Sequence, residues 1–398
     1  MPRVIMVVNS DYRYDARVQK EAAALGMAGY SVTVFSLAMD VRREQNVMGV
    51  RVLNPTTGKM AWFPYKLSYL KAYWQIIRAL LREKADVWHG HDLDMLPFVF
   101  IAAKLKGGKL VYDSHELWQG YDWPSRGGRR GLLRRLLWQG WLWLEKALAK
   151  HCHLIITVNE SCAREIARRL EVRPPLALRN CVDPAETASP AGSLRETLGL
   201  GHSELLVVYT GKLQKGRGLE ELLKAWAGLP ADRHLAIIGQ GPLEGSLRDF
   251  ALSAGLNNVF FLPPVEALEL PGYIRGATLG VVLIEDTDQS KRYSLPNKLL
   301  EYIAAGVPVL ASKLPEISRL VDEYQIGVFA DPGDSGRIRK SLSELLGNAG
   351  KLRFLRLNTL KARVSLTWRK EAGLLISEYS KITKGGKQEA SPLAQGGK

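Results

Sequence analysis

Short apolar runs of strand length alternate with helical stretches along this chain, and the alternation occurs twice. The first series opens with an apolar run at 4–8 and a helical pattern at 16–28, and the second opens with an apolar run at 205–209. Such runs, separated by amphipathic stretches, indicate a parallel sheet with helices on both faces. The later strands are predicted at 31–35, 50–53, 87–88, 109–112 and 154–158 in the first series, and at 235–238, 259–262, 279–283, 307–310 and 327–329 in the second.

A segment rich in proline, glycine and serine separates the two series, as is typical of a linker. The chain has 398 residues, which exceeds what one ordinary hydrophobic core holds. The sequence therefore predicts an α/β protein of two doubly wound domains that face a cleft. The predicted parts are a first domain at 1–183, the linker at 184–203, a second domain at 204–365, a last helix at 366–383 and a disordered tail at 384–398.

The composition is that of a soluble globular protein, with 46% hydrophobic and 24% charged residues. No run of about 18 apolar residues occurs, so the sequence predicts no membrane-spanning helix. Met1 leads into a strand rather than into a signal peptide. Cys152, Cys162 and Cys181 lack metal-ligand spacing, and their odd number favours reduced thiols packed in the core. We therefore expect a cytoplasmic protein.

The stretch Ser-Leu-Pro-Asn-Lys-Leu-Leu-Glu-Tyr-Ile at 294–303 predicts a helix whose N-terminus points at a pocket. Pro296 fits a first helical turn, and Gly306 ends the helix. The unpaired amides and the positive dipole end suit a diphosphate, and Glu301 is placed to accept hydrogen bonds from a ribose. The alternative is an amphipathic helix that only covers a parallel sheet. The candidate donor-binding residues of this helix are Pro296, Asn297, Lys298 and Glu301.

This stretch resembles the nucleotide-sugar site of family 4 of the glycosyltransferases, which have the GT-B fold and retain anomeric configuration. By the order of its elements, the resemblance covers residues 3–382. It implies two Rossmann-like domains facing a central cleft, with the last helix crossing back to the first domain. It also implies a nucleoside-diphosphate sugar as substrate, no cofactor and no essential metal.

The segment Gly239-Gln-Gly241-Pro-Leu-Glu follows a strand and starts like a dinucleotide-binding fingerprint. Glu244 replaces the third glycine and Pro242 enters the turn, so the segment argues against a nicotinamide site. The family has a similar Gly-x-Gly-Pro turn near the nucleotide base. The resemblance therefore makes Gly239 and Gly241 donor-binding candidates.

Two cations follow the strand at 205–209, in the segment Gly211-Lys212-Leu-Gln-Lys215-Gly-Arg217. The family typically has arginine, four intervening residues and lysine here, and in this chain the two cations are exchanged. Departure of a nucleoside diphosphate develops negative charge, which cations in a closed cleft stabilise. The resemblance assigns Lys212 and Arg217 to the diphosphate, beside Gly211, and Lys215 is a substitute for either. The alternative is ordinary surface charge.

A histidine follows the strand at 109–112, in the turn Asp-Ser-His-Glu. The family places a histidine at this strand end, close to the transferred sugar, so the resemblance makes His115 a catalytic candidate. The segment His-Gly-His91-Asp92, after the preceding strand, is similar to the family's His-x-His-Asp segment. No matching Cys or His pair elsewhere in the sequence would complete a metal site. We therefore interpret His91 and Asp92 as acceptor-side or structural residues.

The segment Asp15-Ala-Arg17-Val-Gln-Lys-Glu21 follows the first strand and resembles a stretch common in this group of transferases. Asp15 is expected to cap the following helix, and Arg17 to face the cleft on the acceptor side. The alternative is a capped helix start with pairing between Arg17 and Glu21, four residues apart.

One position departs from the family's pattern of two glutamates separated by seven residues, of which the first binds sugar hydroxyls and the second the ribose. Glu301 matches the second, but Tyr293 occupies the first position. A phenol cannot bind two adjacent hydroxyls as a carboxylate does. Tyr293 stays a donor-binding candidate, and Glu285, Asp286 and Asp288 are carboxylates that can replace the glutamate. A non-standard or deoxy donor sugar also stays open.

The net charge of +15 is concentrated in the N-terminal half, above all at 126–150, where arginines and lysines alternate with leucines and with Trp138, Trp141 and Trp143. This combination suits a helix on an anionic membrane surface. The alternative is an amphipathic helix packed on its own domain. The membrane interpretation implies a protein peripheral on the inner face of the membrane, with a lipid-linked or glycan acceptor. Nucleic acid is disfavoured, because the basic residues lie in no recognised reading module.

Together these observations predict a retaining glycosyltransferase that moves a sugar from a nucleoside-diphosphate donor to an acceptor hydroxyl, with cell-envelope glycan synthesis as one setting. Two alternatives remain open. A sugar-nucleotide 2-epimerase of the same fold would use acid and base carboxylates in the cleft. A non-catalytic membrane scaffold would also explain the basic excess.

Overall fold

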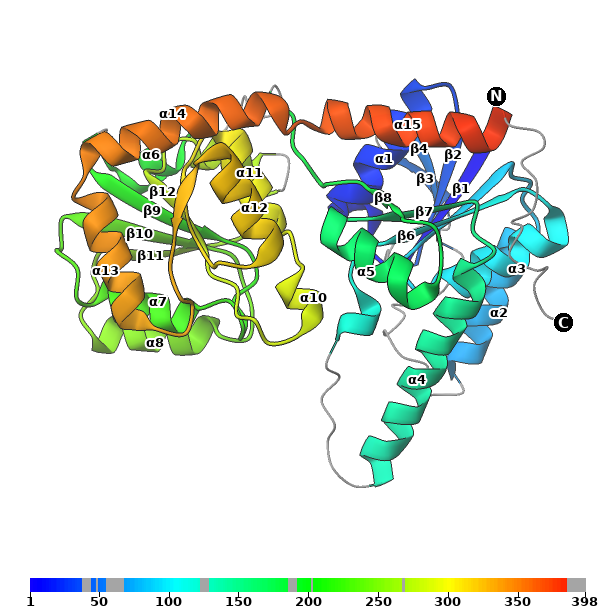
Figure 1. Cartoon of the computed structure of the whole chain (residues 1–398), viewed down its shortest axis with the longest axis horizontal. Helices are drawn as coiled ribbons and strands as arrows, with labels where there is room; N and C mark the ends of the chain where they lie inside the picture. The colour runs from blue at the N-terminus through cyan, green and yellow to red at the C-terminus, as the bar shows by residue number, and fades with distance from the viewer. Residues whose placement is uncertain are drawn as a thin grey trace, which may run out of the picture.

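Figure 1 shows a computed structural model of the chain, which forms two α/β domains side by side. The structure describes residues 1–37, 44–47, 49–54, 68–121, 129–184, 192–201, 203–266 and 269–384. Residues 185–191 of the predicted linker and residues 385–398 of the predicted tail lie outside these ranges.

The first domain is built on an eight-stranded sheet in the order β3-β4-β2-β1-β5-β6-β7-β8. All neighbours are parallel except β3, which pairs antiparallel with β4 at the edge. The polar sequence of β3, Glu-Gln-Asn-Val, gives no strand signal, so only the pairing reveals this strand. The strands are β1 (Arg3–Val8), β2 (Ser31–Ser36), β3 (Glu44–Val47), β4 (Val50–Leu53), β5 (Val87–His91), β6 (Lys109–Ser114), β7 (Leu154–Thr157) and β8 (Leu176–Ala177).

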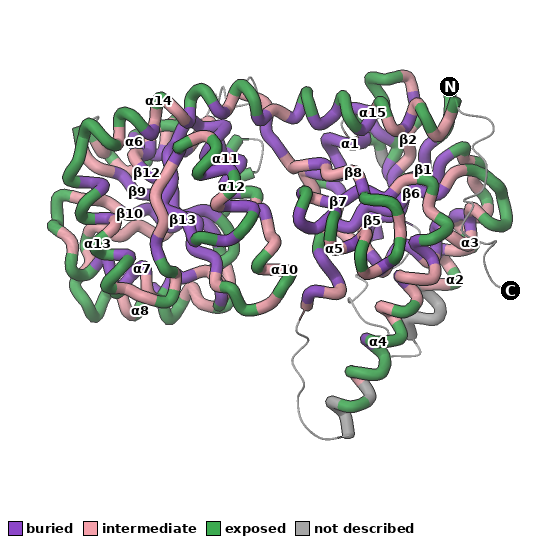
Figure 2. The backbone as a smooth tube through the Cα atoms, viewed as in Figure 1, coloured by how far each residue is buried: buried purple, intermediate pink, exposed green. Residues whose placement is uncertain are grey.

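Helices cover both faces of this sheet. One core joins the sheet to α1 and α15, and a second core joins its other face to α2, α3, α4 and α5. In Figure 2 the buried residues gather along the strands, whereas the outward faces of the helices are exposed. These elements are α1 (Ala16–Met27), α2 (Ser68–Leu80), α3 (Leu96–Lys106), α4 (Arg129–Ala149), α5 (Glu160–Leu170) and α15 (Trp368–Lys384), with the short 3-10 helices η1 (Tyr12–Tyr14) and η2 (Trp118–Gly120).

The second domain contains a parallel six-stranded sheet in the order β11-β10-β9-β12-β13-β14. This order reverses direction between β9 and β12, as in doubly wound nucleotide-binding domains. Its strands are β9 (Leu205–Thr210), β10 (Arg233–Ile238), β11 (Val259–Leu262), β12 (Leu279–Val282), β13 (Val309–Ala311) and β14 (Gly327–Phe329). Its helices are α6 (Leu194–Leu198), α7 (Leu219–Trp226), α8 (Glu244–Ser253), α9 (Leu270–Ile274), α10 (Gln289–Arg292), α11 (Asn297–Ala305), α12 (Pro315–Tyr324), α13 (Ser335–Leu346) and α14 (Ala349–Ser365).

The last two helices join the domains. Figure 1 shows α14 running along the second domain and α15 continuing along the first. Leu375 and Tyr379 of α15 are fully buried in the core that α1 shares with the sheet. The hydroxyl of Tyr379 lies 2.7 Å from His89 Nδ1 on β5, and Glu371 pairs with Arg179 at 2.8 Å. The predicted GT-B architecture, with a C-terminal helix crossing back to the first domain, is confirmed.

The domains also meet at the N-terminus of α5. There Glu316 of α12 accepts a hydrogen bond from the backbone N–H of Ser161 at 2.9 Å. The side-chain amide of Asn159 donates to the carbonyl oxygen of Tyr293, on the loop before α11, at 2.8 Å. A buried carboxylate at a helix N-terminus satisfies an otherwise unpaired amide and opposes the helix dipole. Within the described ranges, no helix has both the length and the apolar character needed to cross a bilayer.

The packing of α15 on the first domain predicts different losses of stability for a buried and an exposed leucine of this helix. Leu375→Ala is expected to lower the free energy of unfolding by about 2–5 kcal/mol, because it leaves a cavity in a closed core. Leu374→Ala, on the same helix at 47% exposure, is expected to change it by about 0.5 kcal/mol or less. Urea unfolding of the two variants checks this, and equal effects would mean that α15 does not dock through Leu375.

Candidate functional site

A cleft of about 1130 Å³ has walls from both domains. Its walls come from the loops after the carboxyl ends of β1, β6, β9 and β10 and from the start of α11. Open α/β sheets bind their ligands at these strand ends. The predicted site residues that line it are Asp15, Arg17, His115, Gly211, Lys212, Arg217, Gly239, Gly241, Pro296, Asn297, Lys298 and Glu301.

Two glycine turns form part of the wall on the side of the second domain. The amide of Gly211, after β9, donates to the carbonyl of Ile238 at 2.9 Å. Gly239, after β10, has a φ of +151°, and a Cβ there would collide with the Gly211 carbonyl oxygen. A Cβ on Gly241 would likewise collide with the carbonyl of Leu213. These glycines are required because the two turns pack backbone against backbone, rather than because they bind a dinucleotide.

Three cations surround this part of the cleft. Lys298 of α11 is 7% exposed, and its Nζ lies 3.5 Å from the centre of the Tyr209 ring. Its ammonium has no hydrogen-bond partner in the described part of the chain. Burial, and then the charge of Arg217, hold the pKa of Lys298 well below its usual range, while Glu301 opposes them. A buried cation without a partner is costly, and an anion in the cleft would remove that cost.

Lys212 and Arg217 approach from the loop between β9 and α7 and also line the cleft. Lys212 is exposed and Arg217 half-buried, and neither forms an ion pair with a carboxylate of the described residues. Lys215, the predicted substitute, is exposed and is not part of the cleft wall. Of the basic residues predicted for the donor site, Lys212, Arg217 and Lys298 therefore line the cleft, and Lys215 does not.

The helix α11 begins one residue later than predicted. Pro296 is extended, with φ −70° and ψ 137°, and Asn297 is the first helical residue. Gly306 ends the helix in the left-handed region at φ +72°. Glu301 lies nearly one turn after Lys298. Desolvation raises its pKa to about 7, against the opposing charges of Lys298 and Lys20.

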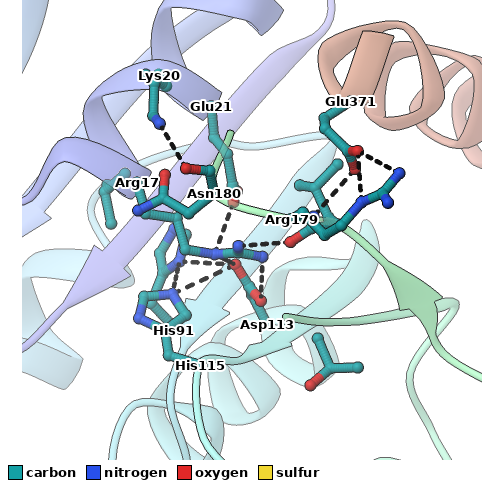
Figure 3. A network of polar contacts seen from close by, with 12 residues as sticks. Arg17, Lys20, Glu21, His91, Asp113, His115, Arg179, Asn180 and Glu371 are labelled. Carbon is teal, nitrogen blue, oxygen red and sulfur yellow. Dashed lines mark hydrogen bonds and ion pairs between the residues drawn. The ribbon is translucent and has the colours of Figure 1, made fainter. Parts of the chain in front are cut away.

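A buried ion-pair network forms the wall on the side of the first domain (Figure 3). Arg17 donates from Nε and Nη2 to the two carboxylate oxygens of Asp113, at 2.9 and 3.0 Å, and from Nη1 to the carbonyl of Leu178 at 2.8 Å. It also lies 3.1 Å from Glu21, four residues along α1. The guanidinium of Arg17 is therefore bound to other protein groups where it lines the cleft. This supports the alternative in which Arg17 pairs with neighbouring residues and has a structural role.

His115 lies between two carboxylates. Its Nδ1 is 3.4 Å from Asp92, and its Nε2 is 3.3 Å from Asp113. Burial lowers the pKa of His115, but the charges of Asp92 and Asp113 outweigh this and raise it to about 10. The two carboxylates therefore favour the protonated, imidazolium form of His115 at neutral pH, and this form contributes positive charge at the edge of the cleft.

His91 and Asp92 lie behind His115 and do not line the cleft. His91 is almost fully buried and faces Asp113 at 3.5 Å. Asp92 has a left-handed backbone, with φ +66°, and accepts a hydrogen bond from the His115 amide at 3.1 Å. Of the two interpretations of this pair, the structural one fits the geometry.

Asp15 caps α1 as predicted, by accepting from the amide of Val18 at 3.2 Å.

The sequence reasoning gave Asp113 no role, although it contacts Arg17, His91 and His115 together. The sequence feature that could have identified it is its position directly after the apolar strand residues, where a carboxylate reaches the sheet edge.

Glu21, His89, His91 and Asp113 also place four ligand-type atoms within 4.8 Å of one another. Because Arg17 already neutralises the carboxylates of this group, we interpret it as an ion-pair network.

Tyr293 does not lie in the donor site where it was predicted. Its side chain packs against the core of the first domain, and it is not part of the cleft wall. Its carbonyl oxygen receives the Asn159 side chain across the domain interface. Asp288 also lies outside the wall, where it caps α10 by accepting from the amide of Lys291 at 2.8 Å, and Asp286 lies 3.5 Å from Arg292. The position of the missing glutamate is thus used to hold the two domains together.

Comparison with known proteins identifies both halves of the chain. Residues 16–186 match the model described as Glycosyltransferase Family 4, and residues 192–359 match the model described as Glycosyl transferases group 1. A D-inositol 3-phosphate glycosyltransferase of Nocardia farcinica is 27% identical over 53% of this chain and 47% of its own length. That of Pseudarthrobacter chlorophenolicus is 25% identical over 79% of this chain and 77% of its own length. The chain spans about half the length of several of these curated relatives.

Solved structures share the fold. A sucrose-phosphate synthase of Thermosynechococcus elongatus superposes with a TM-score of 0.77 at 17% identity, over 96% of this chain and 100% of that one. An Anabaena protein solved in complex with UDP and glucose superposes with a TM-score of 0.70 at 16% identity, over 96% and 100% of the two chains. The two family models and the shared GT-B fold agree with each other, and the chain therefore belongs to the family 4 glycosyltransferases.

Proposed function

We propose that the protein is a retaining glycosyltransferase that moves a sugar from a nucleoside-diphosphate donor to an acceptor hydroxyl. The observation that carries the proposal is the buried amino group of Lys298, which has no hydrogen-bond partner among the described residues, in a cleft that Lys212 and Arg217 also line. A diphosphate is an anion that three such groups can bind together. The similarity to D-inositol 3-phosphate glycosyltransferases supports glycosyl transfer, and the Anabaena structure with UDP and glucose supports this choice of donor.

In the proposed reaction the bond between the anomeric carbon and the diphosphate breaks, and its electron pair leaves with the diphosphate. The acceptor oxygen forms the new bond on the same face of the sugar, and its proton passes to the departing phosphate oxygen. Lys212, Arg217 and Lys298 stabilise the charge that develops on the leaving group. The imidazolium of His115 adds positive charge at the opposite wall, and Glu301 binds the ribose hydroxyls.

The acceptor is proposed to be lipid-linked or adjacent to a membrane, with the protein peripheral on a cytoplasmic membrane face. This part of the proposal rests on α4, which projects from the first domain in Figure 1. Leu132, Leu136 and Trp143 share one face of α4 and are 61%, 61% and 72% exposed, with the exposed Arg135 beside them. Trp138 instead packs in a small cluster with Leu93 and Trp118. Arg126 lies outside the described residues.

A sugar-nucleotide 2-epimerase is the competing enzyme. It would invert one carbon of the donor sugar without any acceptor, whereas a transferase would leave the sugar configuration intact. Incubation of the protein with the donor alone, followed by analysis of the recovered sugar, separates the two. A 2-epimer among the products would overturn the proposed transfer.

Replacement of the cleft cations is expected to lower the transfer rate. Arg217→Ala and Lys298→Met should each cost roughly 100- to 1,000-fold, as for the loss of one preorganised group that stabilises developing charge. Lys215→Ala is the matched control, since it removes a lysine of the same loop outside the cleft wall. Lys298→Met is also expected to keep or raise the melting temperature, because it removes a buried amino group that has no hydrogen-bond partner among the described residues. Full activity of both cleft variants would contradict the diphosphate assignment.

The affinity for the donor is expected to increase with pH through about 7. Below this pH Glu301 is protonated and accepts ribose hydrogen bonds poorly, and above it the carboxylate accepts them fully. Calorimetric titration from pH 6 to pH 8 should use a nucleoside-diphosphate sugar, whose doubly esterified diphosphate does not titrate in this range. Glu301→Gln should weaken binding and reduce its dependence on pH, and the dependence that remains is assigned to Glu116 of the same cleft, whose pKa is also raised to about 7. An unchanged pH profile in Glu301→Gln would remove Glu301 from the ribose site.

The protein is expected to co-sediment with anionic vesicles and to dissociate as salt rises. Each basic residue near such a surface contributes about 1 kcal/mol, screened over about 8 Å at physiological salt. Serine at Arg129, Arg130, Arg134 and Arg135 should abolish binding. Serine at four basic residues of the second domain, Arg337, Arg339, Lys340 and Lys351, should not. Equal binding to neutral vesicles, or none to anionic ones, would contradict the membrane part of the proposal.

A further inference from the structure

Glu116 is a carboxylate of the cleft wall that has no role in the site described so far. It follows His115 in the loop after β6 and is exposed towards the cleft. Its side chain forms no hydrogen bond or ion pair with the residues that the structure describes, although its backbone carbonyl accepts from Ser114 and Trp118. The carboxylate of Glu116 is therefore available to accept hydrogen bonds from a ligand in the cleft.

The other two carboxylates in the described part of the wall are an engaged residue, Asp15, and one already assigned to the ribose, Glu301. Asp15 caps α1 and accepts from the hydroxyl of Ser10 at 2.5 Å. Glu301 lies on α11 beside Lys298, in the part of the site that the proposed function gives to the ribose. Glu116 comes from the first domain and faces the cleft from the opposite wall, next to His115.

Glu116 shares the cleft with cations from both domains. Desolvation raises the pKa of Glu116 to about 7, while the positive charges of His115, Lys291 and Arg217 act to lower it. Two of these cations, Lys291 and Arg217, belong to the second domain and also line the cleft. Glu116 thus faces the cleft from the wall opposite Lys212, Arg217 and Lys298. If these cations bind the diphosphate, a sugar attached to it extends into the space that Glu116 faces.

The residues expected to bind that sugar are not there. Tyr293 is packed between the domains, and neither Asp286 nor Asp288 is part of the cleft wall. Glu285 is also outside the wall. Among the described residues of the wall, Glu301 is thus the one carboxylate from the second domain, and the carboxylate without a hydrogen-bond partner or an assigned role, Glu116, comes from the first domain.

We infer that Glu116 binds hydroxyl groups of the donor sugar and takes over the task that Tyr293 cannot perform. A carboxylate accepts hydrogen bonds from two adjacent hydroxyls, so the inference favours a donor sugar with a vicinal diol over one that lacks it. It rests on the proposed function, since it names the residue that recognises the sugar of the proposed donor.

The test separates binding of the sugar from binding of the nucleotide. Calorimetry without any acceptor gives the ratio of affinities for a nucleoside-diphosphate sugar and its free nucleoside diphosphate. The pairs are UDP-glucose with UDP, UDP-N-acetylglucosamine with UDP, GDP-mannose with GDP, and ADP-glucose with ADP. The pair that the wild-type protein binds most tightly is then measured with Glu116→Gln. Glu285→Gln is the matched control outside the wall, and Tyr293→Phe tests the phenol directly.

Glu116→Gln is expected to lower the affinity for the nucleotide sugar about 10- to 100-fold and to leave the affinity for the free nucleoside diphosphate unchanged. Glu285→Gln and Tyr293→Phe are expected to change neither. An unchanged ratio in Glu116→Gln overturns the inference, as does an equal loss for both ligands, which would indicate a general effect on the site. If the wild-type protein binds none of these nucleotides, the proposed function itself fails.

Discussion

The buried pair of Arg17 and Asp113 determines how the wall on the side of the first domain is built. Arg17 comes from α1 and Asp113 from the end of β6, so their two hydrogen bonds join elements far apart in the sequence. Asp113 in turn contacts His91 and His115, and Arg17 holds the carbonyl of Leu178. Removing one partner of such a pair leaves an uncompensated buried charge, at a cost of about 3–5 kcal/mol. The position and the charge of His115 therefore depend on a buried pair whose two members are already bound to each other.

On the opposite wall of the cleft, the buried cation has no carboxylate partner. Lys298 is as well buried as Arg17, yet it has a tyrosine ring for a neighbour instead of a carboxylate. Arg17 contacts Asp113, Glu21 and the carbonyl of Leu178, whereas Lys298 has no hydrogen-bond partner in the described residues. We therefore interpret Arg17 as a structural cation and Lys298 as a ligand-binding one. This difference, rather than the number of basic residues, carries the proposal of an anionic donor.

The interface between the domains explains the departure at Tyr293. Its half-buried side chain packs against the first domain's core, and its carbonyl accepts a hydrogen bond from the Asn159 side chain at the start of α5. A glutamate side chain would bring an unpaired carboxylate into that apolar contact, which is costly. The loop before α11 therefore positions the helix that carries Lys298 and Glu301, while recognition of the sugar is left to a side chain from the opposite wall.

The sequence by itself determined the two series of strands and helices, the glycine turns, and most residues of the cleft wall, because these depend on local patterns of apolar residues and on strand ends. It did not reveal β3, whose residues have no strand pattern, and it gave no role to Asp113 or Glu116. Only the tertiary structure decided which charged groups are already paired. Arg17 and Lys298 are both basic residues near helix starts, and nothing in their neighbours along the chain distinguishes them. The difference arises because β6 brings Asp113 to Arg17 from 96 residues away, whereas packing brings Lys298 only the face of Tyr209.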